Sequence, residues 1–203
     1  MLKYISFFVC LIMLTACSTT SVGLKYAPST ATVKPISSAL GVFLGNFVDK
    51  RDVGPNWIGA ARITVGVARH NLETNQPVST LFQKAFEAGL RYRGISINYQ
   101  SPSLQISGVI HELYCGQHAV APSSRLSKIE AKAEIEISVT EIISGKQRFN
   151  RKYSALNIVD GPGWTFWNGF AASGEDLFVP TEKTFRDVID KILDDSDFRA
   201  ALQ

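Results

Sequence analysis

The stretch KIEAKAEIEISVT, from Lys128 to Thr140, alternates between polar and apolar residues without a break. A period of two places the apolar side chains on one face of a strand and the charged side chains on the other. The pattern predicts a long antiparallel strand with one buried face and one solvated face.

The residues after this strand predict a hairpin. Ile143-Ser144-Gly145 fits a three-residue loop whose glycine takes the left-handed conformation. The resulting register pairs four positions across the hairpin: Val139 with Phe149, Ile137 with Arg151, Glu136 with Lys152 and Ile135 with Tyr153. This register leaves Arg151 on the apolar inner face, which is unusual for an arginine.

Two helices and three further strands are expected. Apolar residues recur at helical spacing from Val78 to Leu90, entered at Pro77 or Ser79 and closed by Gly94. A second apolar stripe ends at Leu193 and predicts a helix capped by Thr181 after Pro180, followed by a short turn capped by Ser196. Strands are expected at 39–47, 58–69 and 104–114, with loops at 116–124 and 160–179.

Two amphipathic helices cannot bury their apolar stripes against each other and also cover the long strand. The economical arrangement is an α+β fold with a single antiparallel-rich sheet and two amphipathic helices packed on one face.

The N-terminus carries the pattern of a bacterial lipoprotein signal. Lys3 is followed by an apolar run that ends in Leu14-Thr15-Ala16-Cys17. The organisation expected is a signal peptide at 1–16, a lipidated Cys17 with a flexible tether at 17–38, and a periplasmic α+β domain at 39–203. Ser18 follows the cysteine where an aspartate favours retention in the inner membrane, so we expect the outer membrane, with acyl chains on Cys17 as the anchor.

Composition narrows the function classes. The formal charge of +3 over 203 residues, with no run of basic residues, argues against nucleic acid as a partner. No phosphate loop, dinucleotide fingerprint or Gly-x-Ser-x-Gly is present, so no cofactor is expected. The three histidines, His70, His111 and His118, lack the spacing of a metal site, and we expect none.

Cys115 has no intramolecular partner, because Cys10 lies in the signal and Cys17 is expected to carry lipid. An exposed lone thiol would be a liability in an oxidising compartment. We therefore expect Cys115 to be buried near the end of a strand.

Two stretches are candidates for function. Asp49, Arg51 and Asp52 form a charged turn, read either as a binding or catalytic corner, or as a solvated turn in which a carboxylate pairs with arginine or caps the backbone. The 160–179 loop is either a recognition patch or a plug for the core. The aromatic residues that suggest these roles are Trp164, Phe166, Trp167 and Phe170.

Several motifs together resemble the YajG-like bacterial outer-membrane lipoproteins. They are the lipobox, Phe47-x-Asp49-x-Arg51, Ile58-Gly59, Leu72-x-Thr74 before Pro77-Val78, Leu90-x-x-x-Gly94, and the long strand turning at Ser144-Gly145-Lys146. The resemblance implies a small periplasmic α/β domain similar to accessory lipoproteins of transport and assembly machines. It supplies no catalytic residues.

The expected function is a lipid-anchored, non-enzymatic accessory or binding protein of envelope maintenance or assembly, with an envelope protein as its partner. The alternatives are a small envelope hydrolase working near Asp49, Asp52 and His111, or a structural subunit that pairs through a sheet edge. The sequence leaves the oligomeric state open.

Overall fold

The fold was obtained as a computed structural model, which describes residues 18–28, 35–36, 40–62, 68–119, 127–162 and 172–203. These residues form an α+β fold with a seven-stranded mixed sheet and three helices. The strands are β1 Ser18–Val22, β2 Val42–Asp49, β3 Trp57–Arg62, β4 Ala68–Thr74, β5 Leu104–Ala119, β6 Ser127–Glu141 and β7 Gln147–Gly161. The helices are α2 Val78–Tyr92, α3 Gly174–Leu193 and α4 Ser196–Ala201.

The sheet runs in the order β1-β4-β3-β5-β6-β7, and β2 pairs with β5 off this path. The pairs β3–β4, β5–β6 and β6–β7 are antiparallel, whereas β1–β4, β2–β5 and β3–β5 are parallel. The expected antiparallel-rich sheet is therefore corrected to a mixed one. Consecutive strands joined by short connections run antiparallel, but β2 and β3 meet β5 only after the chain has crossed over through α2.

β5 is a branch point in this sheet. Its whole length pairs with β6 on one edge. On the other edge, β2 pairs with its first half, from Leu104 to Ile110, and β3 pairs with Cys115 and Gly116. The sheet therefore forks along β5, with β2 and β3 as the two branches.

The strand that carries the strict alternation is β6, and its burial alternates from Ser127 to Glu141 as predicted. All four register pairs across the β6–β7 hairpin are confirmed. Gly145 has a φ of +69°, as the turn requires. The loop is one residue longer than predicted, because Glu141 N–H donates to Lys146 O, and an irregularity at Thr140 restores the register.

Three predicted boundaries are wrong. The single strand expected at 58–69 is two strands, β3 and β4, and β5 continues through residues 116–119, which were expected to be loop. The 160–179 loop is shorter than predicted, because β7 reaches Gly161 and α3 begins at Gly174. The cap of α3 is Ser173, whose hydroxyl accepts from the Asp176 N–H while the Asp176 side chain accepts from the Ser173 N–H. This capping box satisfies two backbone donors that Thr181, now inside the helix, could not reach.

The other caps also differ in part. Pro77, not Ser79, occupies the N-cap of α2, and Asp195, not Ser196, caps α4 by accepting from the N–H groups of Asp197 and Phe198. Gly94 has a φ of +85° and follows α2, as predicted.

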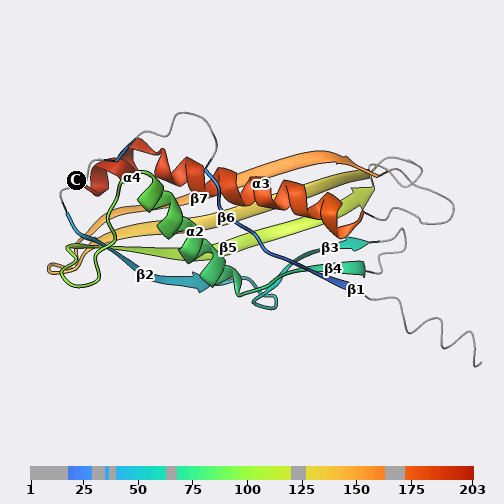
Figure 1. Cartoon of the computed structure of the whole chain (residues 1–203), viewed down its shortest axis with the longest axis horizontal. Coiled ribbons are helices and arrows are strands. Elements are labelled where there is room, and N and C mark those ends of the chain that lie inside the picture. Colours follow the sequence, from blue (N-terminus) through green and yellow to red (C-terminus); the bar gives the residue numbers. More distant parts are fainter. Residues whose placement is uncertain (1–17, 29–34, 37–39, 63–67, 120–126, 163–171) are drawn as a thin grey trace, which may run out of the picture.

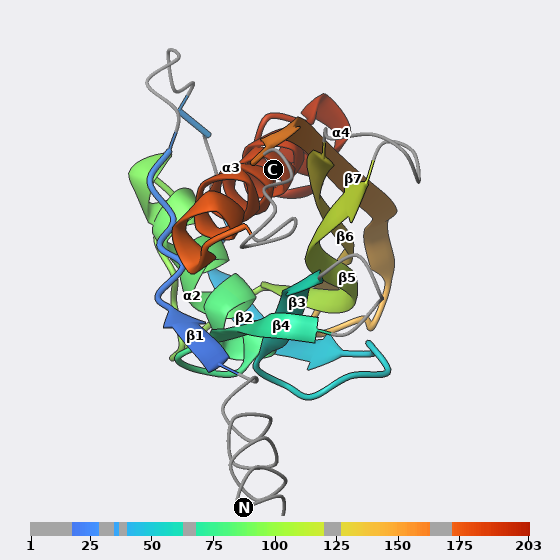
Figure 2. The same cartoon turned by 90° about the vertical axis from the view of Figure 1, so that its right-hand side faces the viewer.

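The sheet curls around the two long helices. Figure 2 shows α2 and α3 on its concave side, with β5, β6 and β7 on one flank and β1 and β4 on the other. α2 contacts β2 and β5, α3 contacts β5, β6 and β7, and the helices contact each other. Phe82 of α2 and Phe185 of α3 meet edge to face, with ring centroids 4.8 Å apart, at the centre of the core.

The described part of the predicted tether lies along the domain. Residues 18–22 form β1, which pairs with β4, and Leu24 and Ile36 are buried. Figure 1 shows this blue segment crossing in front of α2 and α3. Residues 1–17, 29–34 and 37–39 lie outside the described residues.

Candidate functional site

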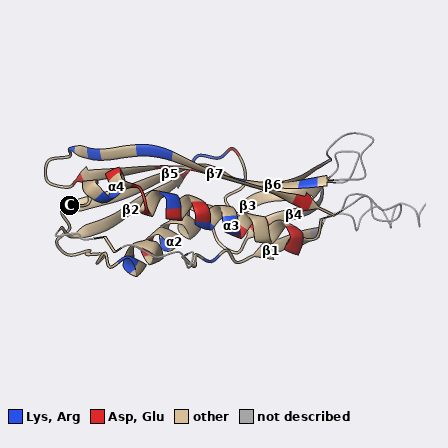
Figure 3. Ribbon diagram, turned by 90° about the horizontal axis from the view of Figure 1, so that it is seen from above, with Lys and Arg blue, Asp and Glu red and all other residues tan. Residues whose placement is uncertain are grey.

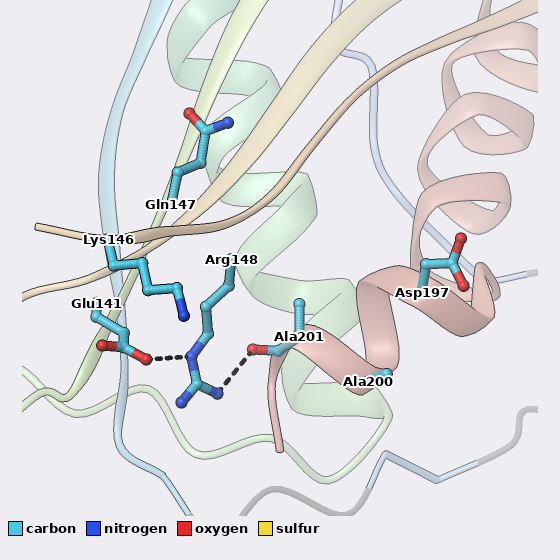
Figure 4. Close-up of a pocket in the computed structure, with 7 residues that line it drawn as sticks. All are labelled: Glu141, Lys146, Gln147, Arg148, Asp197, Ala200 and Ala201. Atoms are coloured by element: carbon cyan, nitrogen blue, oxygen red, sulfur yellow. Dashed lines mark hydrogen bonds and ion pairs between the residues drawn. The ribbon is translucent and has the colours of Figure 1, made fainter.

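The end of the sheet at the β6–β7 hairpin carries two adjoining hollows. The larger, of about 490 Å³, lies between the start of β7 and α4 (Figure 4). The smaller, of about 220 Å³, lies between the hairpin and the start of β5. Glu141 and Arg148 line both hollows and divide them. The other lining residues are Lys146, Gln147, Asp197, Ala200 and Ala201 in the larger and Leu40, Ser103, Leu104 and Ile143 in the smaller.

The dividing wall is an ordered ion pair. Arg148 Nε donates to Glu141 Oε1 over 2.7 Å, and Ser144 Oγ donates to Glu141 Oε2 over 2.6 Å. The Ser144 hydroxyl and the Arg148 guanidinium hold the pKa of the Glu141 carboxyl below its ordinary value. Ser144 and Arg148 both lie on the same hairpin as Glu141, so the turn itself positions the Glu141–Arg148 ion pair.

Lys146 supplies a second cation beside this wall. Its ammonium lines the larger hollow near the Glu141–Arg148 pair (Figure 4), and its charge also favours the ionised form of Glu141. An ammonium on a flexible stem can bind a carboxylate brought by another molecule.

The hairpin tip is apolar. Ile143 is 96% exposed and Ile142 is 41% exposed, next to the polar walls just described. An apolar tip surrounded by fixed charges has the composition of a contact surface for another protein. The sequence carried this signal as two adjacent isoleucines before Ser144-Gly145, and our sequence reasoning treated them only as turn residues.

The residues proposed for hydrolysis do not assemble. Among the described residues, Asp49, Asp52 and His111 share no hydrogen bond or ion pair. Asp52 is exposed, and His111 Nε2 lies 3.2 Å from Glu136 Oε2 on the outer face of the sheet. Of the alternative reading of the charged turn, the pairing of a carboxylate with arginine is confirmed, because Asp49 pairs with Arg51. The expected solvation is wrong for this pair, since the two side chains are only 16% and 5% exposed.

Arg51 is buried in the fork between β2 and β3. Its Nε and Nη2 donate to the two carboxylate oxygens of Asp49 over 2.9 and 2.7 Å. Its Nη1 donates to the carbonyls of Trp57 on β3, over 2.6 Å, and Leu113 on β5, over 3.2 Å. The guanidinium therefore joins three strands where the backbone hydrogen bonds between them are interrupted. This positioning role suits arginine, whose donors are fixed in one plane.

Cys115 is fully buried, as predicted, and its Sγ lies 3.4 Å from Leu177 O. Burial raises the pKa of its thiol to about 11. The thiolate population at neutral pH is then roughly a hundredfold below that of an ordinary thiol. The thiol contributes to packing and is unsuited to nucleophilic chemistry.

We expect Cys115 to resist alkylation at pH 8 in the folded protein and to react quickly once urea unfolds it. Mass spectrometry after iodoacetamide labelling measures this directly. Labelling of Cys115 in native protein at the rate of a free thiol would contradict its burial.

The other sequence candidates cannot be placed. Cys17 and the aromatic residues Trp164, Phe166, Trp167 and Phe170 lie outside the described residues. The residues that flank the aromatic stretch are described. Ser127 Oγ donates to Pro162 O over 2.8 Å, and Ala172 N–H donates to Gln117 Oε1 over 2.8 Å.

The described residues contain neither a metal-ligand cluster nor a membrane-spanning helix. No three His, Cys, Asp or Glu side chains there are grouped so as to hold a metal ion. None of the helices described is both long enough and apolar enough to span a membrane.

A family model of uncharacterized lipoproteins, Lipoprotein_16, matches residues 48–203. The chain belongs to this family. The match supports the resemblance to YajG-like lipoproteins drawn from the sequence motifs. No curated protein matches this Lipoprotein_16 member.

The fold of this Lipoprotein_16 member is similar to that of solved structures. XCC0632 from Xanthomonas campestris, of family DUF330, is 13% identical, with 90% of this chain and 96% of that chain covered and a TM-score of 0.59. Lipoprotein GNA1162 from Neisseria meningitidis is 6% identical, with 77% and 99% covered and a TM-score of 0.33. The first likeness shows a shared fold, and the second is too distant to support a conclusion.

Proposed function

We propose that this lipoprotein is an accessory protein of the bacterial envelope, anchored by acyl chains on Cys17 to the periplasmic face of the outer membrane, that works by contact and not by catalysis. The observation that carries the contact role is the apolar hairpin tip, with Ile143 96% exposed beside the hollows divided by Arg148 and Glu141. The partner proposed is an envelope protein that presents an apolar pocket for the tip and a carboxylate for Lys146.

The physical basis is the anatomy of protein interfaces. A few well-placed apolar side chains supply most of the binding free energy, and surrounding polar groups set orientation and exclude water. Ile142 and Ile143 have the first role here, and the Glu141–Arg148 pair has the second, since its geometry is already fixed before a partner arrives.

A photo-crosslinking amino acid at Ile143 is expected to capture one main partner in intact cells, identified by mass spectrometry. The same amino acid at Lys84, exposed on α2, is the matched control and is expected to capture little. The substitution Ile142→Asp should reduce capture from position 143 at least tenfold, because a charge would be buried in the interface. Equal capture at positions 143 and 84 would contradict the proposal.

The structural-subunit alternative has one feature against it. β7 is an edge strand of the sheet, and the carbonyl of its central residue Ser154 accepts a hydrogen bond from Lys191 Nζ over 3.2 Å. Lys191 belongs to α3, and a helix that covers part of an edge strand is a common protection against pairing with another chain. The residues Trp164, Phe166, Trp167 and Phe170 stay a second proposed contact surface.

A further inference from the structure

The strand directions bring one set of chain ends together. β3 and β5 run the same way, and β1, β4 and β6 run against them. The starts of β1, β4 and β6 and the ends of β3, β5 and β7 therefore lie at one end of the sheet (Figure 1). We call this the β1-start end; the hairpin end, with Ile143, is the opposite one.

The residue that follows Cys17 in the chain is already part of the sheet. Ser18 is the first residue of β1 and pairs in register with His70 of β4. Consecutive Cα atoms lie about 3.8 Å apart, so the sulfur that would carry acyl chains is held within one residue of the β1-start end.

The segment after β1 is also held. Tyr26 OH donates to Asp190 Oδ1 over 2.6 Å, and Arg93 Nη1 donates to Tyr26 OH over 3.0 Å. Further along, Ile36 N–H donates to Arg93 O over 2.9 Å, and the side chains of Leu24 and Ile36 are buried. Contacts on both helices therefore oppose the release of β1 as a free tether.

The described polar side chains at the β1-start end suit the headgroup layer. His118, Lys128 and Asp160 are exposed there, and Lys128 pairs with Asp160. Charged and polar groups are stable in the headgroup layer and costly in hydrocarbon.

We infer that the β1-start end rests against the lipid headgroups, so the domain stands end-on and holds its hairpin end away from the bilayer. This inference rests on the proposed lipid anchor. β6 has 15 residues, so the hairpin stands about 50 Å from the membrane surface at about 3.3 Å per residue. The bilayer is the partner of one end and the envelope protein is the partner of the other.

The test uses full-length protein matured in cells and reconstituted in vesicles of phosphatidylethanolamine and phosphatidylglycerol with nitroxide-labelled headgroups. A bimane fluorophore is attached to Lys128→Cys at the β1-start end or to Ile143→Cys at the hairpin end. The buried Cys115 stays unlabelled. We expect the nitroxides to quench the fluorophore at position 128 several-fold more than the one at 143.

A second variant tests whether the direct connection from Cys17 to β1 keeps the β1-start end at the membrane. A Gly-Ser spacer of about 12 residues between Ser18 and Thr19 adds about 20 Å of average reach. It should reduce quenching at position 128 at least twofold, and unchanged quenching would overturn the inference.

The outcomes separate the two proposals. Acyl mass on Cys17 with equal quenching at 128 and 143 overturns the end-on orientation and leaves the anchor intact. An unacylated mature protein overturns both the anchor and the orientation.

Discussion

Gly59→Ala is expected to destabilise the domain by more than about 4 kcal/mol, which leaves little folded protein. Gly59 lies on β3 where this strand meets β5, with a φ of +152° that side chains rarely adopt. A Cβ atom at this position would lie 1.8 Å from the backbone oxygen of Cys115. That oxygen belongs to the central strand, so the clash can be relieved only by separating β3 from β5. Urea unfolding followed by circular dichroism measures the loss.

Two glycines serve as matched controls for this substitution. Gly54→Ala meets only the Trp57 Cβ, at 3.9 Å, and should change stability by less than about 0.5 kcal/mol. Gly145→Ala has open space but a φ of +69°, so it should cost about 1 kcal/mol. If Gly59→Ala were no more destabilising than Gly145→Ala, the close approach of β3 to β5 would be wrong.

Arg51→Ala is expected to cost about 3–5 kcal/mol, because it breaks a buried ion pair from one side. The Arg51 side chain is only 5% exposed and that of Asp49 is 16% exposed, so water replaces the guanidinium poorly. The substitution leaves the Asp49 carboxylate without its bidentate partner and removes one donor each from the carbonyls of Trp57 and Leu113. Thermal unfolding and urea titration of the same variant measure the effect.

The control is an arginine in an exposed pair. Arg91, 56% exposed, bonds Glu87 one turn away on α2, and Arg91→Ala should cost less than about 0.5 kcal/mol. Arg51→Lys keeps the charge but loses the fork of donors, so it should lie between the two. A stability of Arg51→Ala equal to that of Arg91→Ala would show that the fork in the sheet does not depend on Arg51.

The part of the fold that follows from local periodicity could be predicted from the sequence. The alternation in β6 is uninterrupted, and a slip of one residue would turn lysines toward the core. The sequence therefore also predicted the register of β6 against β7. The expected difficulty at Arg151 is resolved by tertiary contacts. Its guanidinium reaches Asp195 and Asp197 of α4, and Figure 3 shows basic residues along β7 and acidic residues on α3 and α4.

The rest depends on partners distant in sequence. β3 and β4 are short and carry few bulky apolar residues, so their pairing is specified by the close approach at Gly59 and by contacts with β5 and β1. The start of α3 was missed because Pro180 was read as a helix boundary, whereas the Ser173–Asp176 capping box begins the helix earlier. The candidate site at the hairpin was missed because exposed isoleucines have no periodic pattern. The isoleucines become a candidate contact surface only because the start of β5 and α4, distant in sequence, form the hollows beside them.

The placement of β1 and the β6–β7 hairpin at opposite ends of the sheet has a mechanical consequence. With the proposed lipid on Cys17 and the proposed partner at Ile143, a force between them would be directed along the strands of the sheet, since β1 begins at one end and the β6–β7 hairpin lies at the other. A force in this direction loads the hydrogen bonds between neighbouring strands in shear, so they bear it together and do not break one after another. Unfolding by such a force would require many hydrogen bonds to break at once. The domain would therefore resist a force between the proposed membrane anchor and the proposed partner better than its modest size suggests.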